Sequence, residues 1–397
     1  MTVLENALPR RIPLAIDKLG VLIAAIALVA LFMPFAAFRA NRIVLGESKS
    51  ILGALPGWEA AILILALVAS IVLALLKTPT LWRLAVSLAM LALLFVAIGH
   101  AATNLTPPGD RIARVSPGGG FWLLIFAFAL LAADAIARLK LTPWTRIAVL
   151  GGVAAFVAIL LASGTLNDVS VLREYFNRGE TFWREAQTHV ALALGSLFAA
   201  TIVGVPVGIL CHRSDALRAP VLNVLNIIQT IPSIALFGLL IAPLAWVAAN
   251  IPGASALGVS GIGAAPAMVA LFGYSLLPVV ANTVVGLESV PPADDDAAKG
   301  MGMTDWQRLV GVQFPLAFPV ILTGIRIVLV QNIGLATIAA LIGGGGFGVF
   351  VFQGVAQTAM DLVLLGAVPT VALAFAAAVV LDAVVELVSP RGGERES

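Results

Sequence analysis

Long runs of apolar residues separated by short polar loops make up most of the chain. Because an α-helix rises about 1.5 Å per residue, about 20 apolar residues can cross the hydrocarbon core of a bilayer. Runs of this kind lie at 19–38, 58–76, 81–102, 119–137, 146–163, 189–211, 219–246, 262–287, 316–342 and 362–388. The pattern predicts an all-α, polytopic membrane protein with about ten transmembrane helices.

Composition agrees with a membrane protein and excludes several other classes. Hydrophobic residues make up 60% of the 397 residues and charged residues only 11%, whereas a soluble domain carries roughly 25% charged residues. The net charge of +2 is small and the basic residues are spread along the chain, so no nucleic-acid partner is expected. The single cysteine, Cys211, lies in an apolar run, which indicates a packing role and excludes an intramolecular disulfide.

A mixed-charge segment divides the chain into two sets of predicted spans. Residues 1–164 form a membrane region of about five helices whose role is unknown, and 165–188 are expected to form an external amphipathic linker. Residues 189–388 hold the remaining spans, which are richer in Gln, Asn, Pro and Gly, and 389–397 are expected to form a cytoplasmic tail. No self-similarity relates the two halves, so an inverted repeat is not indicated.

The distribution of Lys and Arg between the loops predicts the orientation of the spans. With the N-terminus inside, these residues are more frequent in the cytoplasmic loops than outside, and the outer loops 247–261 and 343–361 contain none. The bias is clearest in the second half of the chain. It predicts that the loop 288–315 lies in the cytoplasm.

The loop 288–315 contains the stretch DDDAAKGMGMTDWQRLVGVQFP, which begins at residue 294. Pro291 and Pro292 suit the first turn of a helix, and the three aspartates that follow complement the partial positive charge of its unpaired amides. We therefore expect a short helix over 292–301. Gly300 and Gly302 allow the chain to leave this helix with positive φ.

A second short helix is predicted directly after these glycines. Thr304 and Gln307 fit the capping-box pattern, and Pro315 and Pro319 are expected to mark the end of this helix and the entry to the next span. Two short helices joined by a glycine turn would form a compact knob, on which small side chains let another backbone approach closely. The alternative is a linker that only connects two spans.

The same segment resembles the loop with the pattern E-A-A-x-x-x-G, nine residues, I-x-L-P of ABC importer permeases. Asp296, Ala297, Ala298, Gly302 and Pro315 match this pattern, with Asp in place of Glu at 296, Val in place of Ile at 312 and Phe in place of Leu at 314. The resemblance implies that these five residues couple the chain to a groove of a cytoplasmic ATPase.

The resemblance extends over about 180–397. The segments LNVLNIIQTIPSIALFGLLIAPL (222–244), APAMVALFGYSLLPVVANTVVGL (265–287) and VQNIGLATIAALIGGGGFGVFVFQG (330–354) are similar to those of osmoprotectant permeases, the glycine betaine, choline and carnitine branch. This implies a type I ABC importer permease core in the C-terminal half. The layout of the longer first half is similar to that of the larger betaine-uptake permeases of Gram-negative bacteria.

The resemblance also implies location and partners. The chain is expected to be a multi-pass protein of the cell inner membrane, surrounded by the lipid bilayer. Its expected partners are cytoplasmic ABC ATPase subunits, which bind ATP and Mg, a periplasmic substrate-binding protein, and a second copy of this permease or a different permease subunit.

No nucleotide or catalytic site is recognisable in the chain itself. GESKS at 46–50 lacks the spacing of a P-loop, and GGGGFG at 343–348 follows a membrane span rather than a strand, so a flexible or tight outer turn is expected there. The three histidines, His100, His189 and His212, are isolated and show no metal-ligand spacing. We expect a transport subunit that has neither enzymatic activity nor a cofactor or metal of its own.

Several polar residues lie inside the predicted spans of the second half. The candidate translocation path comprises Gln229, Pro232, Asn282, Gln331 and Asn332. Amides in hydrocarbon need partners, so these residues either form hydrogen bonds between helices or line a path that solvates a zwitterion. No aromatic cage for a quaternary ammonium is recognisable, and Trp246 and Tyr274 are only scattered candidates.

The charged residues inside the spans have simpler expected roles. Arg326 is expected either to extend its guanidinium to the membrane interface or to pair with a carboxylate. Asp134, Asp382 and Glu386 lie near the ends of their spans, where solvation is the expected explanation.

Three other functions remain open alongside import of glycine betaine or choline. An ion-coupled secondary transporter of small zwitterions could use the same amides, but it leaves the cytoplasmic knob unexplained. A permease for another small amine or amino acid would share every feature. A membrane-embedded enzyme is weakest, because no catalytic constellation is recognisable.

Overall fold

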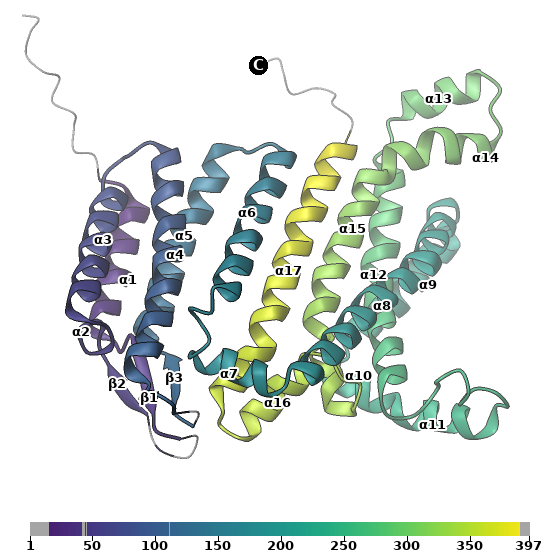
Figure 1. Cartoon of the computed structure of the whole chain (residues 1–397). Coiled ribbons are helices and arrows are strands. Elements are labelled where there is room, and N and C mark those ends of the chain that lie inside the picture. The colour runs from purple at the N-terminus through teal and green to yellow at the C-terminus, as the bar shows by residue number, and fades with distance from the viewer. Residues whose placement is uncertain (1–15, 42–43, 45, 111, 390–397) are drawn as a thin grey trace, which may run out of the picture. The chain divides into compact units, whose positions relative to one another are not determined.

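The computed structural model describes residues 16–41, 44, 46–110 and 112–389. The predicted tail over 389–397 lies outside the described residues except for Ser389, as do residues 1–15 of the first region. The described residues are predominantly helical (Figure 1). Among them, nine helices are long and apolar enough to cross a membrane, and α1 (Lys18–Phe32) is a shorter apolar helix. This agrees with the predicted polytopic, helical membrane protein.

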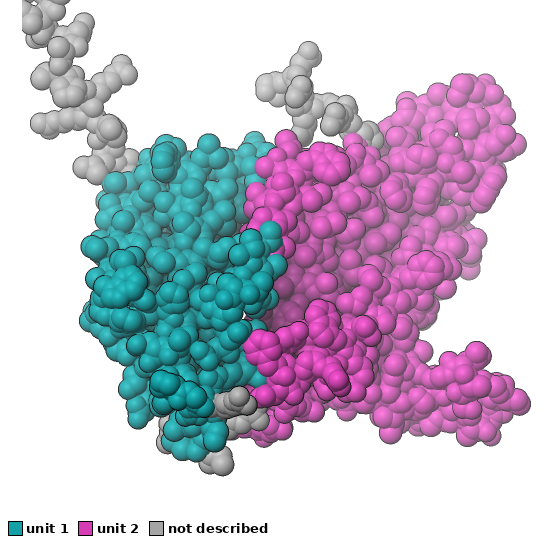
Figure 2. Space-filling view, in the orientation of Figure 1, with its two compact units in different colours: residues 1–141, 155–173 teal, residues 142–154, 174–397 magenta. Residues whose placement is uncertain are grey.

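The chain folds into two compact units (Figure 2). Unit 1 comprises residues 1–141 and 155–173, and unit 2 comprises 142–154 and 174–397. The helix α6 (Pro143–Ala162) begins in unit 2 and ends in unit 1, and α7 (Ser170–Asn177) lies across the second boundary.

Unit 1 combines apolar helices with a small antiparallel sheet. Its helices are α1, α2 (Ile51–Ala54), α3 (Gly57–Leu75), α4 (Thr80–Leu105) and α5 (Gly119–Leu139). The strand order is β2-β1-β3, and the bounds are Ala36–Arg39 for β1, Glu47–Lys49 for β2 and Arg114–Pro117 for β3. The sequence pattern did not predict these strands, because each is only a few residues long and lies in a loop between spans.

Close helix contacts and buried apolar side chains hold unit 1 together. A Cβ on Gly20 of α1 would lie 2.0 Å from the carbonyl oxygen of Ala74 on α3, so only glycine permits this approach. Phe121 of α5 is buried and meets Phe35 edge to face with 5.9 Å between the ring centroids. The core is therefore built from small residues between backbones and large rings between helices.

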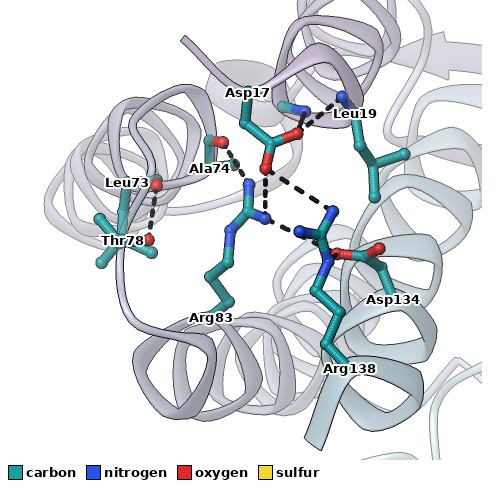
Figure 3. Close-up of polar contacts among 9 residues, drawn as sticks. Asp17, Leu19, Leu73, Ala74, Thr78, Arg83, Asp134 and Arg138 are labelled. Atoms are coloured by element: carbon teal, nitrogen blue, oxygen red, sulfur yellow. Dashed lines mark hydrogen bonds and ion pairs between the residues drawn. The ribbon is translucent and has the colours of Figure 1, made fainter. Parts of the chain in front are cut away.

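A buried ion-pair network joins four helices of unit 1 at one end (Figure 3). Asp17 caps α1 by accepting the amide of Leu19 at 2.9 Å, and its Oδ2 lies 2.6 Å from Nη1 of Arg83 on α4. Nη2 of Arg83 donates to the carbonyl oxygen of Ala74 at 2.8 Å. Asp134 of α5 lies 2.8 Å from Nε of Arg138 and 3.6 Å from Arg83. Asp134 is therefore paired, and the expectation that solvation explains it was wrong.

Unit 2 is organised around four long helices. They are α8 (Gly179–Arg213), α12 (Ala264–Glu288), α15 (Phe314–Leu335) and α17 (Met360–Val388). Glycines at the crossings let these helices approach closely. A Cβ on Gly324 of α15 would lie 2.6 Å from Cβ of Asn282 on α12, and one on Gly208 of α8 would lie 2.5 Å from Cβ of Thr283. Such small-residue contacts are typical of helix association in membranes.

Two predicted spans of unit 2 are broken, and one is longer than predicted. The run 219–246 is divided between α9 (Asp215–Thr230), α10 (Ser233–Leu239) and α11 (Ile241–Asn250). The ninth helix, predicted over 316–342, ends at Leu335 and is followed by the 3₁₀ segment η2 (Ile338–Ile342). The sixth starts at Gly179 rather than at 189, because polar residues continue it beyond the apolar run.

Pro232 explains the first break. A proline disfavours helical ψ in the residue before it, and Ile231 is extended with φ −69° and ψ 127°. Pro232 then precedes the first turn of α10, where its missing amide hydrogen costs little. An apolar run alone therefore did not reveal that the chain changes direction here.

We expect the Arg83→Met substitution to destabilise unit 1 strongly, by about 3 kcal/mol, because it leaves the buried carboxylate of Asp17 without its main partner. The measurement is the thermal unfolding midpoint of the detergent-solubilised protein. Lys49→Met is the matched control. Lys49 pairs with Glu47 near the surface, and loss of this ion pair should lower the free energy of unfolding by about 1 kcal/mol at most. Equal midpoints for the two variants would show that the network does not stabilise the fold.

Candidate functional site

The loop between α12 and α15 forms a helical hairpin, here defined as residues 292–313, that projects beyond the ends of these two helices (Figure 1). Its first helix, α13, spans Pro292–Gly300 and has Asp294 and Asp295 in its first turn, which confirms the predicted short helix. Gly302 has a φ of 80°, a conformation that favours glycine, and it reverses the chain after α13. Gly300, in contrast, remains within the helix.

The second helix of the hairpin, α14 (Asp305–Arg308), starts with the predicted capping box. Oγ1 of Thr304 accepts the amide of Gln307 at 3.3 Å, and Oε1 of Gln307 accepts the amide of Thr304 at 2.8 Å. Both hydrogen bonds satisfy amides that an uncapped helix start would leave without partners.

The hairpin continues into the membrane helix without a break. The π-helical segment η1 (Leu309–Gln313) joins α14 directly to α15, and the amide of Phe314 donates to the carbonyl oxygen of Leu309. The prediction that Pro315 and Pro319 mark the end of the second helix was wrong, since α14 ends at Arg308, but the predicted entry to the next span is confirmed for Pro315. Pro315 lies in the first turn of α15 and Pro319 inside it, and the wider turns of η1 precede the first proline. The hairpin and α15 are therefore joined without an intervening loop.

Asp295 holds the two arms of the hairpin together. Its Oδ2 lies 3.0 Å from Nη1 of Arg308, and its Oδ1 accepts a hydrogen bond from Nε2 of Gln313 at 2.8 Å. Ala298, one turn further along α13, is only 1% exposed. The sequence motif indicates Asp296 rather than Asp295, although the helical spacing between Asp295 and Ala298 places these two residues on one face.

The remaining motif residues lie at the surface, three on the hairpin and Pro315 at the start of α15. Asp296, Ala297, Gly302 and Pro315 are exposed, so Ala298 alone of the five predicted coupling residues is buried. Three large apolar side chains are exposed beside them: Met301 at 76%, Trp306 at 68% and Val310 at 51%. The hairpin therefore presents apolar and small side chains together on its surface.

The predicted path residue Asn332 forms a buried hydrogen-bond network. Its Nδ2 donates to Oγ of Ser196 on α8 and to Oγ of Ser275 on α12, each at 2.9 Å. All three side chains are fully buried. The network thus joins α8, α12 and α15 at one level, and neither serine was recognised from the sequence, because serines in apolar runs carry no distinguishing pattern.

Gln229 replaces a hydrogen-bond donor that a proline removes. Pro278 in α12 has no amide hydrogen to donate to the carbonyl of Tyr274, four residues earlier. Nε2 of Gln229 donates to that carbonyl oxygen at 2.6 Å, and Oη of Tyr274 donates to the carbonyl oxygen of Ile231 at the break between α9 and α10. Pro232 lies beside this contact and is exposed.

Two further predicted path residues have half-buried side chains. Nδ2 of Asn282 donates to the carbonyl oxygen of Pro278 in its own helix at 2.8 Å. Gln331 lies on α15 next to Asn332, and it is half-buried where Asn332 is fully buried. Gln229 thus contacts α12, to which Asn282 belongs, and Gln331 on α15 is more exposed than its neighbour Asn332.

A glycine-rich turn at the other end of α15 is held by two side chains of α8. Oε2 of Glu185 accepts the amide of Gly346 at 2.8 Å, and Nδ1 of His189 accepts the amide of Phe347 at 3.3 Å. These amides lie at the start of α16 (Gly348–Ala356). Gly343, Gly345 and Gly346 have positive φ, so GGGGFG forms a tight turn, one of the two expected forms. Neither Glu185 nor His189 was recognised from the sequence.

Arg326 pairs with a carboxylate, as one of the two expectations had it. Its Nη1 lies 2.6 Å from Oδ1 of Asp382 on α17, and Arg146 of α6 contacts both Asp382 and Glu386. Asp382 and Glu386 are partly exposed, as expected for residues near the end of a span, and both are also paired with arginines.

Two protein families match separate parts of the chain. Residues 204–392 match the family described as "Binding-protein-dependent transport system inner membrane component", and residues 17–172 match "ABC transporter permease YehY, N-terminal domain". The chain belongs to the permease subunits of binding-protein-dependent ABC importers. It is a multi-pass inner-membrane transport subunit, and in this family the ATPase is a separate subunit.

Two curated relatives resemble the second half of the chain. The osmoprotectant import permease protein OsmW of Salmonella typhimurium is 43% identical over 203 residues, which is 51% of this chain and 88% of that protein. The glycine betaine/carnitine/choline transport system permease protein OpuCB of Bacillus subtilis is 35% identical over 216 residues, 54% of this chain and 92% of that protein. Among solved structures, the methionine ABC transporter MetNI covers 54% of this chain with 23% identity and a TM-score of 0.46.

We expect Asp295→Ala to loosen the hairpin and Asp296→Ala to leave it unchanged, because only the first removes contacts between its arms. The first change should lower the local opening free energy by about 1 kcal/mol, which raises amide hydrogen exchange in 292–313 about fivefold. Mass-spectrometric hydrogen exchange measures the effect. The assignment of Asp295 as the anchor fails if the exposed Asp296 has the larger effect.

Proposed function

We propose that this chain is the translocating subunit of an ATP-driven importer for a small osmoprotectant such as glycine betaine or choline. The substrate class is supported by the relatives of Salmonella and Bacillus, whose names specify osmoprotectants and glycine betaine, carnitine and choline. The observation that carries the ATP-driven mechanism is the exposed hairpin, which is continuous with a membrane helix and fits a force-receiving element.

The hairpin is proposed to dock on a cytoplasmic ABC ATPase, which binds ATP and Mg. Asp296, Ala297 and Gly302 face outward together with Trp306 and Met301, so an apolar groove on the ATPase can bury these side chains. Buried aromatic side chains often dominate such interfaces. Ala298 contributes differently, because it lets the arms of the hairpin pack closely.

ATP binding is proposed to close two ATPase subunits and to displace the docked hairpin. Because η1 joins the hairpin to α15 without a loop, the displacement shifts α15 against α8 and α12. The path then opens toward a periplasmic binding protein that delivers the substrate, and ATP hydrolysis returns it to the inward-open state. A second copy of this chain or a different permease subunit completes the path.

The path is proposed to include Gln229, Pro232, Asn282 and Gln331. Amides solvate a zwitterion through donors and acceptors without fixing it by charge, and a transporter must release what it carries. Gln331 is the strongest of these, because it lies on the helix that the hairpin moves and its amide is half-buried. We assign Asn332 to helix positioning because all its described partners are buried.

We expect Ala297→Trp and Trp306→Ala to abolish co-purification with the ATPase while leaving the permease folded, because both positions are exposed. Co-purification is measured after co-expression with the ATPase, and uptake of labelled glycine betaine is measured in proteoliposomes. Ala133→Trp, at an exposed position of α5 in unit 1, is the control and should retain both. Undiminished association of both hairpin variants would exclude the hairpin as the docking element.

We expect Gln331→Leu to reduce glycine betaine uptake about tenfold, equivalent to about 1.4 kcal/mol, with unchanged stability and ATPase association. Asn332→Leu should instead lower the free energy of unfolding by about 1–3 kcal/mol, because it removes the buried hydrogen bonds that join α15 to Ser196 and Ser275. Uptake and thermal unfolding of the two variants distinguish the roles. Normal uptake by Gln331→Leu would remove this residue from the path.

A further inference from the structure

Four charged side chains from three helices form one cluster in unit 2. Nη1 of Arg146 on α6 lies 3.0 Å from Oδ2 of Asp382, and its Nη2 lies 2.8 Å from Oε2 of Glu386. Nη1 of Arg326 on α15 lies 2.6 Å from Oδ1 of Asp382. Asp382 is therefore shared, with one oxygen atom facing α6 and the other facing α15.

The cluster contacts the helix that continues from the hairpin. Arg326 is the single charged residue of α15, so its pair with Asp382 is the ionic contact between α15 and α17. Asp382 and Glu386 lie one turn apart on α17 and repel one another unless two cations balance them. Arg146 supplies the second cation and thereby affects how firmly Asp382 holds Arg326.

Packing contributes little to holding α6 in place. Among the described residues of α6, only Leu160 is buried, so most of this apolar helix has no packing partner in the structure. The first half of α6, which belongs to unit 2, is instead joined to α17 by the two ion pairs of Arg146. A contact made by charges rather than by apolar surface can be broken and remade without exposing a core.

The cluster is also poorly suited to a purely stabilising role. The exposed fractions of the four side chains are 27% for Arg146, 36% for Arg326, 41% for Asp382 and 49% for Glu386. Ion pairs this exposed contribute little to stability and are weakened by salt. The ion pairs of Arg146 instead determine the position of α6 relative to α17, because α6 has few packing contacts.

The helix α6 precedes the part of the chain that matches the permease family, residues 204–392. The 203 residues matched in the Salmonella permease already make up 88% of that relative, which leaves no room there for the first five spans of this chain. Arg146 thus lies outside the matched permease region but contacts a helix within it. Such a contact fits control of the movement of the permease helices rather than transport itself.

We propose that α6 acts through Arg146 as a releasable clamp on the permease core. When Arg146 binds Asp382 and Glu386, it fixes α17 and, through Arg326, restrains the movement of α15 that the hairpin drives. When the contact opens, α15 moves more freely and the transport cycle runs faster. This inference rests on the proposed function, because it requires that the hairpin transmits force from an ATPase.

The test uses the full chain with its ATPase in proteoliposomes and measures ATP hydrolysis without cargo and uptake of labelled glycine betaine. At low salt, Arg146→Gln should raise both rates about two- to fivefold, the range that the loss of partly exposed ion pairs allows. Raising the ionic strength on the hairpin side should accelerate the unsubstituted protein, because salt screens the same pairs, and should accelerate Arg146→Gln less, because only the pair of Arg326 with Asp382 is left to screen.

A charge exchange provides the rescue. The double substitution Arg146→Glu with Glu386→Arg restores an ion pair between α6 and α17 and should return both rates and the salt response toward those of the unsubstituted protein. Lys49→Gln, which removes an exposed ion pair of unit 1, is the matched control and should change neither rate.

Three outcomes would overturn the clamp. Rates of Arg146→Gln that equal those of the unsubstituted protein at every salt concentration exclude a restraint. A lower thermal unfolding midpoint together with lower rates shows that Arg146 only stabilises the fold. If the ATPase binds neither protein, the proposed function itself fails, and ATPase co-purification measured on the same samples separates this result from the other two.

Discussion

In the hydrocarbon core of a membrane no water replaces a missing hydrogen-bond partner, and the rest of unit 2 depends on this constraint. Pro278 frees the carbonyl of Tyr274, and the side chain of Gln229 on another helix donates to it. The hydroxyl of Tyr274 in turn satisfies the carbonyl of Ile231, where Pro232 interrupts the helix. The carbonyl groups that two prolines leave without a partner are thus satisfied by the side chains of Gln229 and Tyr274, which join the two helices.

The same constraint explains why the long helices of unit 2 meet in a defined register. The side-chain amide of Asn332 donates to the hydroxyls of Ser196 and Ser275, so it has both partners only when α8, α12 and α15 meet at the same level. Glycines such as Gly324 and Gly208 then bring the helix backbones within reach. Hydrogen bonds and close backbone contacts together thus fix the register of these three helices.

Features that depend on residues close in sequence were predictable. The apolar runs indicated most of the membrane helices, and Thr304 with Gln307 indicated the start of α14, because hydrophobic periodicity and capping are local. The breaks at Ile231 and Leu240 were missed, because an apolar run does not show where a helix turns within it.

Contacts between distant residues were not predictable in the same way. Asp17 and Arg83 are 66 residues apart, and Arg146 and Asp382 are 236 residues apart, so no local pattern joins them. The candidate site was only partly predictable for the same reason. The motif indicated the hairpin, but whether Asp295 or Asp296 faces Arg308 depends on how the two arms pack.

The contact of Glu185 and His189 with the turn before α16 has a consequence for biosynthesis. The amides of Gly346 and Phe347 find these acceptors on a helix made about 160 residues earlier. As the chain leaves the ribosome, α8 must already be inserted when the glycine turn emerges, or the first turn of α16 begins with unpaired amides. Folding of the turn before α16 therefore depends on α8, which is synthesised earlier and supplies the two acceptors.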